Sequence, residues 1–168
     1  LHLMMDVFRN HNKSLFDFFG FSFGPNKNDN WRNEVKNYFI KFEDVTKISD
    51  KEVADLSRKL EIDIAIDLMG HTGGFENRLN IFLNECAPVQ VNFLGYPGTL
   101  GTDKIDYIIA DRNLIQEDEK KFYSEKIIYL PNSYQPSEKE RHISDKKFTK
   151  EEFNLPNDKF IFCCFNSN

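Results

Sequence analysis

Short apolar runs alternate along residues 1–131 with stretches whose apolar residues have helical spacing. The run Ile62–Leu68 is mostly β-branched or small, which is typical of a strand buried in a parallel sheet. Further strands are expected at 16–23, 38–42, 89–94, 106–111 and 126–130. Helices are expected at 1–10, 31–38, 49–60, 77–85 and 117–123. Strands that alternate with helices predict an α/β fold with a parallel, doubly wound sheet.

The remainder of the chain has a different pattern. Residues 132–158 are mostly polar and are expected to form a linker or an extended crossover. The apolar run Phe160–Phe165 predicts a strand that begins a second unit. Cys163 and Cys164 would face opposite sides of that strand, so a place in a core is favoured over a redox pair. The chain opens on Leu1 and ends soon after this run, so we expect it to be a fragment.

Composition narrows the class of protein. With 168 residues, 40% of them apolar and 29% charged, the chain matches one soluble globular domain. Its net charge of −5 argues against nucleic acid as a partner. No apolar run approaches the length of a membrane span, and no signal-peptide pattern is visible. Three cysteines cannot form a disulfide framework, so a cytoplasmic location is predicted.

Two glycine-containing loops follow expected strands. The segment 70–74 follows Ile62–Leu68, and the segment 95–101 follows the strand at 89–94. In open α/β sheets ligands bind beyond the carboxyl ends of the strands, and glycine lets a backbone approach a ligand closely. The loops therefore form either a ligand surface built from two adjacent strand ends or a pair of ordinary tight turns.

Individual residues near these loops have two interpretations each. His71 is a candidate acid, base or hydrogen-bond donor, or a histidine that only orders its loop. Arg78 could bind phosphate or carboxylate, or lie on a solvated helix face. The four histidines lack metal-ligand spacing, so no metal site is predicted. The chain also lacks the glycine-rich dinucleotide and P-loop signatures and the D-x-D motif of many glycosyltransferases.

One long motif resembles a known family. The string A-P-V-Q-V-N-F-L-G-Y-P-G-T-L-G at 87–101 strongly resembles the catalytic region of the protein O-linked N-acetylglucosamine transferase and SPINDLY family. The string D-L-M-G-H-T at 67–72, the run D-Y-I-I-A-D at 106–111 and Y-S-E-K at 123–126 follow in that family's order. The segment F-C-C-F-N at 162–166 resembles the first strand of the family's second catalytic lobe.

The resemblance implies a fold and an activity. The family has two Rossmann-like lobes in the GT-B architecture, usually preceded by tetratricopeptide repeats. Its members transfer a sugar from a nucleotide donor to Ser or Thr hydroxyls with inversion and without a metal, so no cofactor is expected. The implied donor is UDP-N-acetylglucosamine, with fucose as the other sugar in the family, and the implied partners are acceptor proteins. The substrate-binding residues that it implies are Gly70, Thr72, Arg78, Leu94, Gly95, Tyr96, Pro97, Gly98, Thr99, Asn166 and Ser167.

The chain departs from the family pattern at several places. The first strand of the family's lobe is absent, and the stretch between Gly70 and Arg78 is two residues longer than in the family pattern. The S-[SA]-D-F-x-x-H stretch, with its active-site Asp and His, does not occur, and His2 matches only a second, downstream His. Glu85-Cys86 stands where the family usually has Arg followed by a small residue or Pro. Ser167 replaces an Asn or Gln, and the chain ends before the family's Y-K. His2 and His71 are therefore the only catalytic candidates in this fragment.

These observations define one interpretation and two alternatives. We expect a partial N-terminal catalytic lobe at 1–131, an inter-lobe linker at 132–158 and the first strand of the C-terminal lobe at 159–168. The chain would be a fragment, truncated at both ends and inactive alone, of an inverting peptide O-glycosyltransferase. The first alternative is a non-catalytic protein-binding module derived from the same lobe, with which the departures at Glu85 and Ser167 are consistent. The second is a different sugar-nucleotide enzyme of the same architecture, against which the length of the motif at 87–101 argues.

Overall fold

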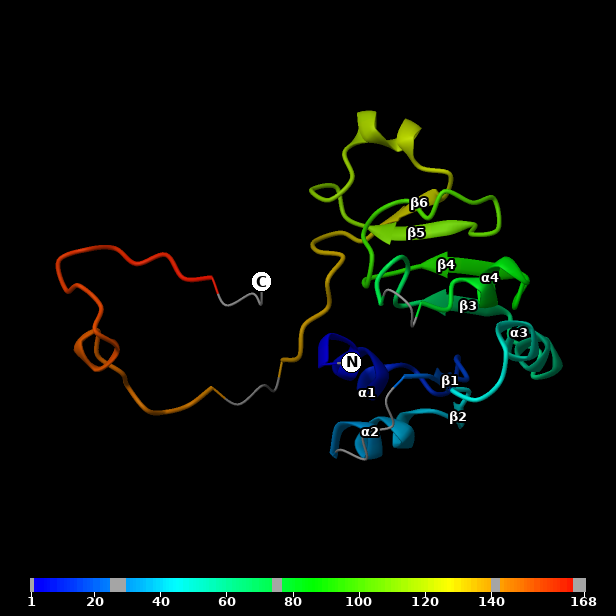
Figure 1. Cartoon of the computed structure of the whole chain (residues 1–168), viewed down its shortest axis with the longest axis horizontal. Coiled ribbons are helices and arrows are strands. Elements are labelled where there is room, and N and C mark those ends of the chain that lie inside the picture. Colours follow the sequence, from blue (N-terminus) through cyan, green and yellow to red (C-terminus); the bar gives the residue numbers. More distant parts are fainter. Residues whose placement is uncertain (1, 25–29, 74–76, 140–142, 165–168) are drawn as a thin grey trace. The chain divides into compact units, whose positions relative to one another are not determined.

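The computed structural model describes residues 2–24, 30–73, 77–139 and 143–164, without the side chain of His2. The chain divides into two units, residues 1–138 and 139–168, and Figure 1 draws the elements of each. The first unit contains α-helices, 3-10 helices and strands. Its α-helices are α1 (Met5–Asn10), α2 (Asn30–Val35), α3 (Asp50–Lys59) and α4 (Asn80–Leu83), and 3-10 helices span His2–Met4, Lys36–Tyr38 and Glu117–Phe122. Its strands are β1 (Phe19–Ser22), β2 (Lys41–Asp44), β3 (Ile64–Asp67), β4 (Val89–Asn92), β5 (Tyr107–Ala110) and β6 (Lys126–Tyr129).

All strand pairs are parallel, as the alternating pattern predicts. The strands form two ladders, one of β1 and β2 and one in the order β3-β4-β5-β6. In the larger ladder Asp67 pairs with Asn92, and Val91 pairs with Tyr107. The α/β class is thus confirmed, but the described strands do not join into the single sheet that was predicted. β1 and β3 each have one described partner.

Local sequence signals set several element boundaries. The helix predicted from Ser49 forms as α3, and its N-terminus has a complete capping box. The Glu52 backbone N–H donates to Ser49 Oγ at 3.3 Å, and the Ser49 N–H donates to the Glu52 carboxylate at 2.8 Å. The helix expected at 117–123 forms as a 3-10 helix at Glu117–Phe122. The strand expected at 38–42 instead lies at Lys41–Asp44, after a 3-10 turn.

Two apolar clusters lie on opposite faces of the strands. Met5 and Phe8 of α1 pack with Phe93, which follows β4, in one cluster. Val53 of α3 and Ile81 of α4 belong to the other. Each cluster contacts residues of both ladders. The helices therefore cover the strands on both sides, as a doubly wound arrangement requires.

The second unit corrects two predictions. Residues 160–164 contain no strand, and Phe165 lies outside the described residues. Cys163 and Cys164 are exposed, not core residues. Phe160 and Phe162 touch one another but are 81% and 91% exposed, so nothing described in this unit buries the run. A strand needs a ladder partner and a packed face, and the described residues of 139–168 supply neither. The only helical element described there is a 3-10 turn at Glu151–Phe153.

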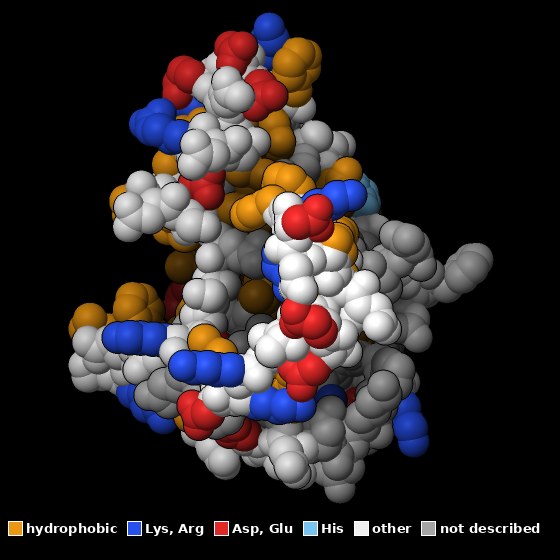
Figure 2. All heavy atoms as spheres, turned by 90° about the vertical axis from the view of Figure 1, so that its left-hand side faces the viewer, with side chains coloured by type: hydrophobic (Ala, Val, Ile, Leu, Met, Phe, Trp, Pro, Cys, Tyr) orange, Lys and Arg blue, Asp and Glu red, His pale blue; other side chains and the backbone are white. Residues whose placement is uncertain are grey.

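The distribution of charged side chains on the surface agrees with the mixed charge of the composition. The face shown in Figure 2 has Lys and Arg side chains interspersed with Asp and Glu, without a broad field of one sign. Within the part of the chain that the structure describes, no helix combines the length and apolar character that crossing a bilayer demands.

Candidate functional site

The two predicted loops lie side by side at the carboxyl edge of the larger ladder. One follows β3 and the other follows β4, and the arrowheads of β4 and β5 in Figure 1 point to this edge. Because β3 and β4 are parallel and adjacent, their carboxyl ends meet there. The His71 and Tyr96 rings make a T-shaped contact with their centroids 5.1 Å apart. The structure thus brings together the two segments that the sequence singled out.

Gly95 is the point where the two strand ends approach each other. A Cβ added to Gly95 would lie 2.1 Å from the carbonyl oxygen of Leu68 and 2.9 Å from the Cα of Met69. Both atoms belong to the backbone, so no side-chain rotation could relieve the clash. The chain needs glycine here for packing between strand ends. Its place beside a donor sugar, which the resemblance implies, stays a prediction.

Leu94 turns the chain out of β4 with a strained backbone. Its φ is +73°, and the Gly95 N–H donates to the Phe93 carbonyl at 2.9 Å. This combination describes a γ-turn of the rare positive-φ kind. Such strain costs roughly 1–3 kcal/mol and collects at functional sites, where the surrounding structure enforces it. Here the partly buried Leu94 side chain packs on the α1 cluster and holds the turn in place.

Buried polar side chains at the ends of β3 and β4 hold the backbone of both loops by hydrogen bonds. Asn92 is fully buried, and its amide donates to the carbonyls of Tyr96 at 3.1 Å and Gly98 at 3.0 Å. Asp67 accepts from the backbone N–H groups of Met69 at 2.8 Å and Gly70 at 3.0 Å. Side chains at the ends of two adjacent strands therefore set the course of the backbone that follows each strand.

Glu125 fixes the far end of the second loop. Its carboxylate is 5% exposed and accepts from the Leu100 backbone N–H at 2.6 Å and from the Thr99 hydroxyl at 2.8 Å. The Ser124 hydroxyl also donates to it at 3.2 Å. Hydrogen bonds to a charged acceptor are stronger than neutral ones. The predicted site residue Thr99 is therefore tied to the segment that leads into β6.

The predicted residues of the first loop differ in their roles. Gly70 has a φ of +57°, and a Cβ there would lie 2.5 Å from the Cβ of Tyr96, so this glycine serves the contact between the loops. Thr72 is exposed and donates its hydroxyl to the Met69 carbonyl at 2.5 Å. His71 is also exposed, as is Pro97 in the neighbouring loop. The exposed side chains of this edge are the ones available to a ligand.

Arg78 is engaged within the chain. Its guanidinium donates to the Asp50 carboxylate at 2.6 Å and to the carbonyls of Val45 and Ile48 at 2.7 Å each. It thereby joins the start of α4 to the connection between β2 and α3. The Arg78 side chain is only 14% exposed, so it does not lie on a solvated helix face. A contact of Arg78 with a phosphate or carboxylate of a ligand stays a prediction.

Three predicted residues lie outside what can be described. The side chain of His2 is not described, and Asn166 and Ser167 fall in the segment 165–168. Among the described residues, no three His, Cys, Asp or Glu side chains gather closely enough to hold a metal ion. Metal independence stays a prediction from the resemblance.

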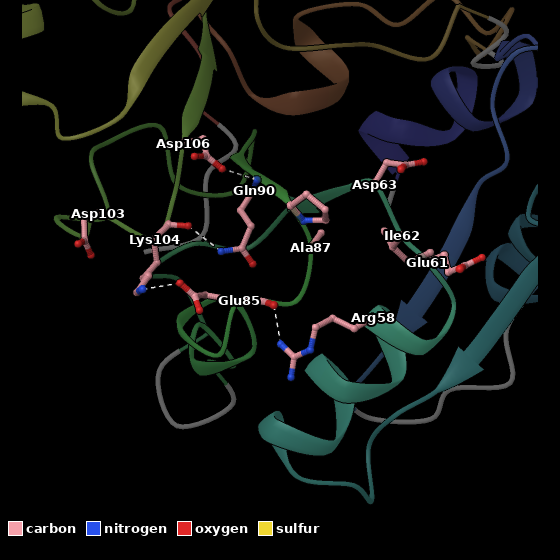
Figure 3. A pocket seen from close by; sticks show the side chains of 11 residues that line it. Arg58, Glu61, Ile62, Asp63, Glu85, Ala87, Gln90, Asp103, Lys104 and Asp106 are labelled. Atoms are coloured by element: carbon pink, nitrogen blue, oxygen red, sulfur yellow. Dashed lines mark hydrogen bonds and ion pairs between the residues drawn. The ribbon is translucent and has the colours of Figure 1, made fainter.

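Glu85, one residue of the departure at Glu85-Cys86, lines a cavity at the amino edge of the same ladder. Figure 3 shows this cavity of about 570 Å³ with charged side chains around it. Glu85 pairs with Lys104, which lowers the pKa of the Glu85 carboxyl. Arg58 donates to the carbonyls of Asn84 and Glu85. The buried Cys86 thiol contacts Gln90, and its burial raises its pKa to about 11. These groups bind one another, and they lie at the edge of the ladder opposite to the two loops.

Comparison with known proteins decides the family. Residues 1–148 match the sequence model of glycosyl transferase family 41. The chain belongs to glycosyl transferase family 41. It is 35% identical to the probable UDP-N-acetylglucosamine--peptide N-acetylglucosaminyltransferase SEC of Arabidopsis thaliana, over 98% of this chain and 17% of that protein. It is 30% identical to the UDP-N-acetylglucosamine--peptide N-acetylglucosaminyltransferase of Caenorhabditis elegans, over 89% of this chain and 13% of that protein.

A solved structure agrees with the family assignment. A mutant of the Thermobaculum terrenum O-GlcNAc transferase superposes with a TM-score of 0.75 at 28% identity and covers 80% of this chain. The match takes in 25% of the bacterial chain. The predicted fold class, part of one lobe of a GT-B glycosyltransferase, is confirmed. The family 41 chain described here spans less than a fifth of the two transferases that it matches in sequence.

The residues that hold the loops were not among the predicted site residues. A local signal could have identified Asp67. An aspartate at the end of a strand commonly accepts hydrogen bonds from the backbone N–H groups two and three residues later, as in an Asx turn. No local signal in the sequence identifies Asn92 or Glu125, because the loop residues that they bind become their neighbours only when the chain folds.

Proposed function

We propose that this chain is part of an inverting peptide O-glycosyltransferase that moves N-acetylglucosamine from UDP-N-acetylglucosamine to Ser or Thr hydroxyls of proteins. The observation that carries the proposal is the loop pair at the carboxyl edge, held from below by Asn92, Asp67 and Glu125, in a family 41 chain. A surface organised in this way before a ligand arrives costs little further ordering when one binds.

The proposed role of this edge is positioning. In an inverting transfer the acceptor hydroxyl attacks the anomeric carbon in line while the diphosphate leaves, so both groups must be held in one geometry. We assign the wall beside the sugar and the acceptor to His71, Thr72, Tyr96 and Pro97. The diphosphate site, the second lobe and any tetratricopeptide repeats would lie outside this chain. We also propose a cytoplasmic location and a reaction without a metal.

The experiment compares the two edges of the ladder in the complete enzyme encoded by the same reading frame. Transfer of labelled N-acetylglucosamine to a Ser/Thr peptide is measured for His71→Ala and for Asp103→Ala. Asp103 lines the amino-edge cavity and serves as the matched exposed control. We expect His71→Ala to lower kcat/KM at least about tenfold, which corresponds to about 1.4 kcal/mol of transition-state binding. Asp103→Ala should leave kcat/KM within about twofold of the unmodified enzyme.

Three outcomes are informative. Unchanged kinetics for His71→Ala would remove this loop from the active site. A large loss for Asp103→Ala alone would move the site to the opposite edge. If the unmodified enzyme binds the peptide but transfers no sugar, the alternative of a non-catalytic binding module is correct.

A further inference from the structure

His71 lies in a tight turn at the carboxyl edge of the larger ladder. The Thr72 backbone N–H donates to the Met69 carbonyl at 3.2 Å, so residues 69–72 form a β-turn. Gly70 is the first central residue of this turn, with a φ of +57°, and the exposed His71 is the second. The Thr72 hydroxyl also donates to the Met69 carbonyl. The backbone of this short turn therefore decides where the His71 ring is presented.

The side chain of Asn77 holds this turn by two hydrogen bonds. Its amide nitrogen donates to the Gly70 carbonyl and to the Thr72 carbonyl, the second at 2.9 Å. The Gly70 carbonyl belongs to the peptide group that leads into His71, and the Thr72 carbonyl belongs to the peptide group that leaves Thr72. The two exposed residues of the first loop that we assign to the site wall, His71 and Thr72, therefore lie between the two groups that Asn77 binds.

The amide oxygen of Asn77 fixes the side chain itself. It accepts from the Leu79 backbone N–H at 2.9 Å, directly before α4 begins at Asn80. An Asn amide has two N–H donors and one oxygen, so every polar atom of the half-buried Asn77 side chain has a partner within the chain. The side chain thus connects the turn to the start of a helix.

The residue after Asn77 anchors it to the body of the first unit. The Arg78 guanidinium binds the Asp50 carboxylate, at the start of α3, and two backbone carbonyls in the connection from β2. The planar fork of an Arg side chain makes such a set of contacts geometrically exact. Asn77 is therefore attached to the connection between β2 and α3, and its two hydrogen bonds fix the turn relative to those elements.

We infer that Asn77 is a positioning residue that sets the orientation of His71 for the transfer reaction. The inference rests on the proposed function, in which His71 is part of the wall beside the sugar and the acceptor. Two contacts then define the place of His71, since the Tyr96 ring touches its side chain and Asn77 holds its backbone. A displacement of about 1 Å in such a group can lower a rate about a hundredfold.

The test is Asn77→Asp in the complete enzyme encoded by the same reading frame. An Asp carboxylate keeps an acceptor for the Leu79 N–H but has no N–H to donate to the two carbonyls of the turn. We expect kcat per folded enzyme to fall about tenfold, with KM for UDP-N-acetylglucosamine within about twofold, because the diphosphate site is proposed to lie outside this chain. Asn77→Ala adds no charge and should lower kcat by a similar factor.

Asn84→Asp is the matched control. The Asn84 amide nitrogen donates to the Asn80 carbonyl at 2.7 Å, so this variant loses the same kind of donor at the other end of α4. Its kcat should stay within about twofold of the unmodified enzyme. The second control is a double-mutant cycle. In the His71→Ala background Asn77→Asp should change kcat by less than about twofold, because a residue that acts through His71 has no effect once that ring is removed.

Amide hydrogen exchange tests the hold on the turn without reference to sugar transfer. The Thr72 amide, which donates to the Met69 carbonyl inside the turn, should exchange at least about fivefold faster in Asn77→Asp. The Leu100 amide in the second loop, which donates to the Glu125 carboxylate, is the internal control and should not change.

Three results would overturn the inference. The first is unchanged exchange of the Thr72 amide in Asn77→Asp. The second is an unchanged kcat, with or without a lower melting temperature, because Asn77 would then only stabilise the fold. The third is a loss of kcat in the His71→Ala background as large as in the unmodified enzyme. Unchanged kinetics for His71→Ala alone would refute the proposed function, and the inference with it, so the two failures can be told apart.

Discussion

Gly95 provides a direct test of how the two loops are packed. In Gly95→Ala the new methyl group would lie 2.1 Å from the Leu68 carbonyl oxygen. Because the clash is with backbone atoms, relief requires a shift of the backbone at the end of β3 or β4, which also disturbs the hydrogen bonds from Asn92. We expect the free energy of unfolding to fall by about 3 kcal/mol, the upper part of the range for overpacking. For a chain of this size the melting temperature should fall by about 6–12 °C.

Gly98→Ala is the matched control, because it adds the same methyl group to the same loop. The atoms within 3.3 Å of a Cβ at Gly98 all belong to the side chain of Tyr96, which can move. We expect this variant to lose less than about 1 kcal/mol. Urea unfolding of both variants, with comparison of midpoints at constant m-value, measures the difference. If Gly95→Ala proves as stable as Gly98→Ala, the loops are not packed as described.

Three other properties can be measured independently. Glu125→Ala should destabilise the chain by about 3 kcal/mol, and Glu125→Gln by less, because Gln keeps one acceptor for the Leu100 N–H; urea midpoints check this. The Cys86 thiol, whose pKa is raised to about 11 by burial, should resist iodoacetamide at about pH 8 in the native state while the two exposed cysteines react, as mass spectrometry would show. Hydrogen bonds from backbone N–H groups, that of Tyr134 foremost, lower the pKa of the Asp111 carboxyl in the folded chain. The contribution of Asp111 to the free energy of unfolding is therefore complete above the unfolded-state pKa of about 3.9, and it is lost as the pH falls through the lower pKa of the folded state. Asp111→Asn should therefore flatten the loss of stability on acidification, and a urea midpoint with the native acid dependence would contradict this.

Much of the architecture could be predicted because the signals are local. β-Branched runs of strand length, helical spacing and the capping box at Ser49 act over a few residues, and each produced the expected kind of element. The meeting of the two loops could also be predicted, since adjacent parallel strands must end at the same edge. The prediction of a strand at Phe160–Phe165 failed because it too relied on a local signal alone. An apolar run specifies a strand only if a partner strand and a covering layer exist, and the described residues of its unit provide none.

Contacts between distant segments could not be read from the sequence. Its letters do not show that Gly95 meets the Leu68 backbone, that Arg78 binds Asp50 and two carbonyls, or that Glu125 holds Thr99. The break between β1 and β3 is of the same kind. The sequence by itself determined the type and order of the elements, because those depend on neighbours along the chain. Only the tertiary structure determined which contacts hold the site residues in place, because packing and hydrogen bonding depend on neighbours in space.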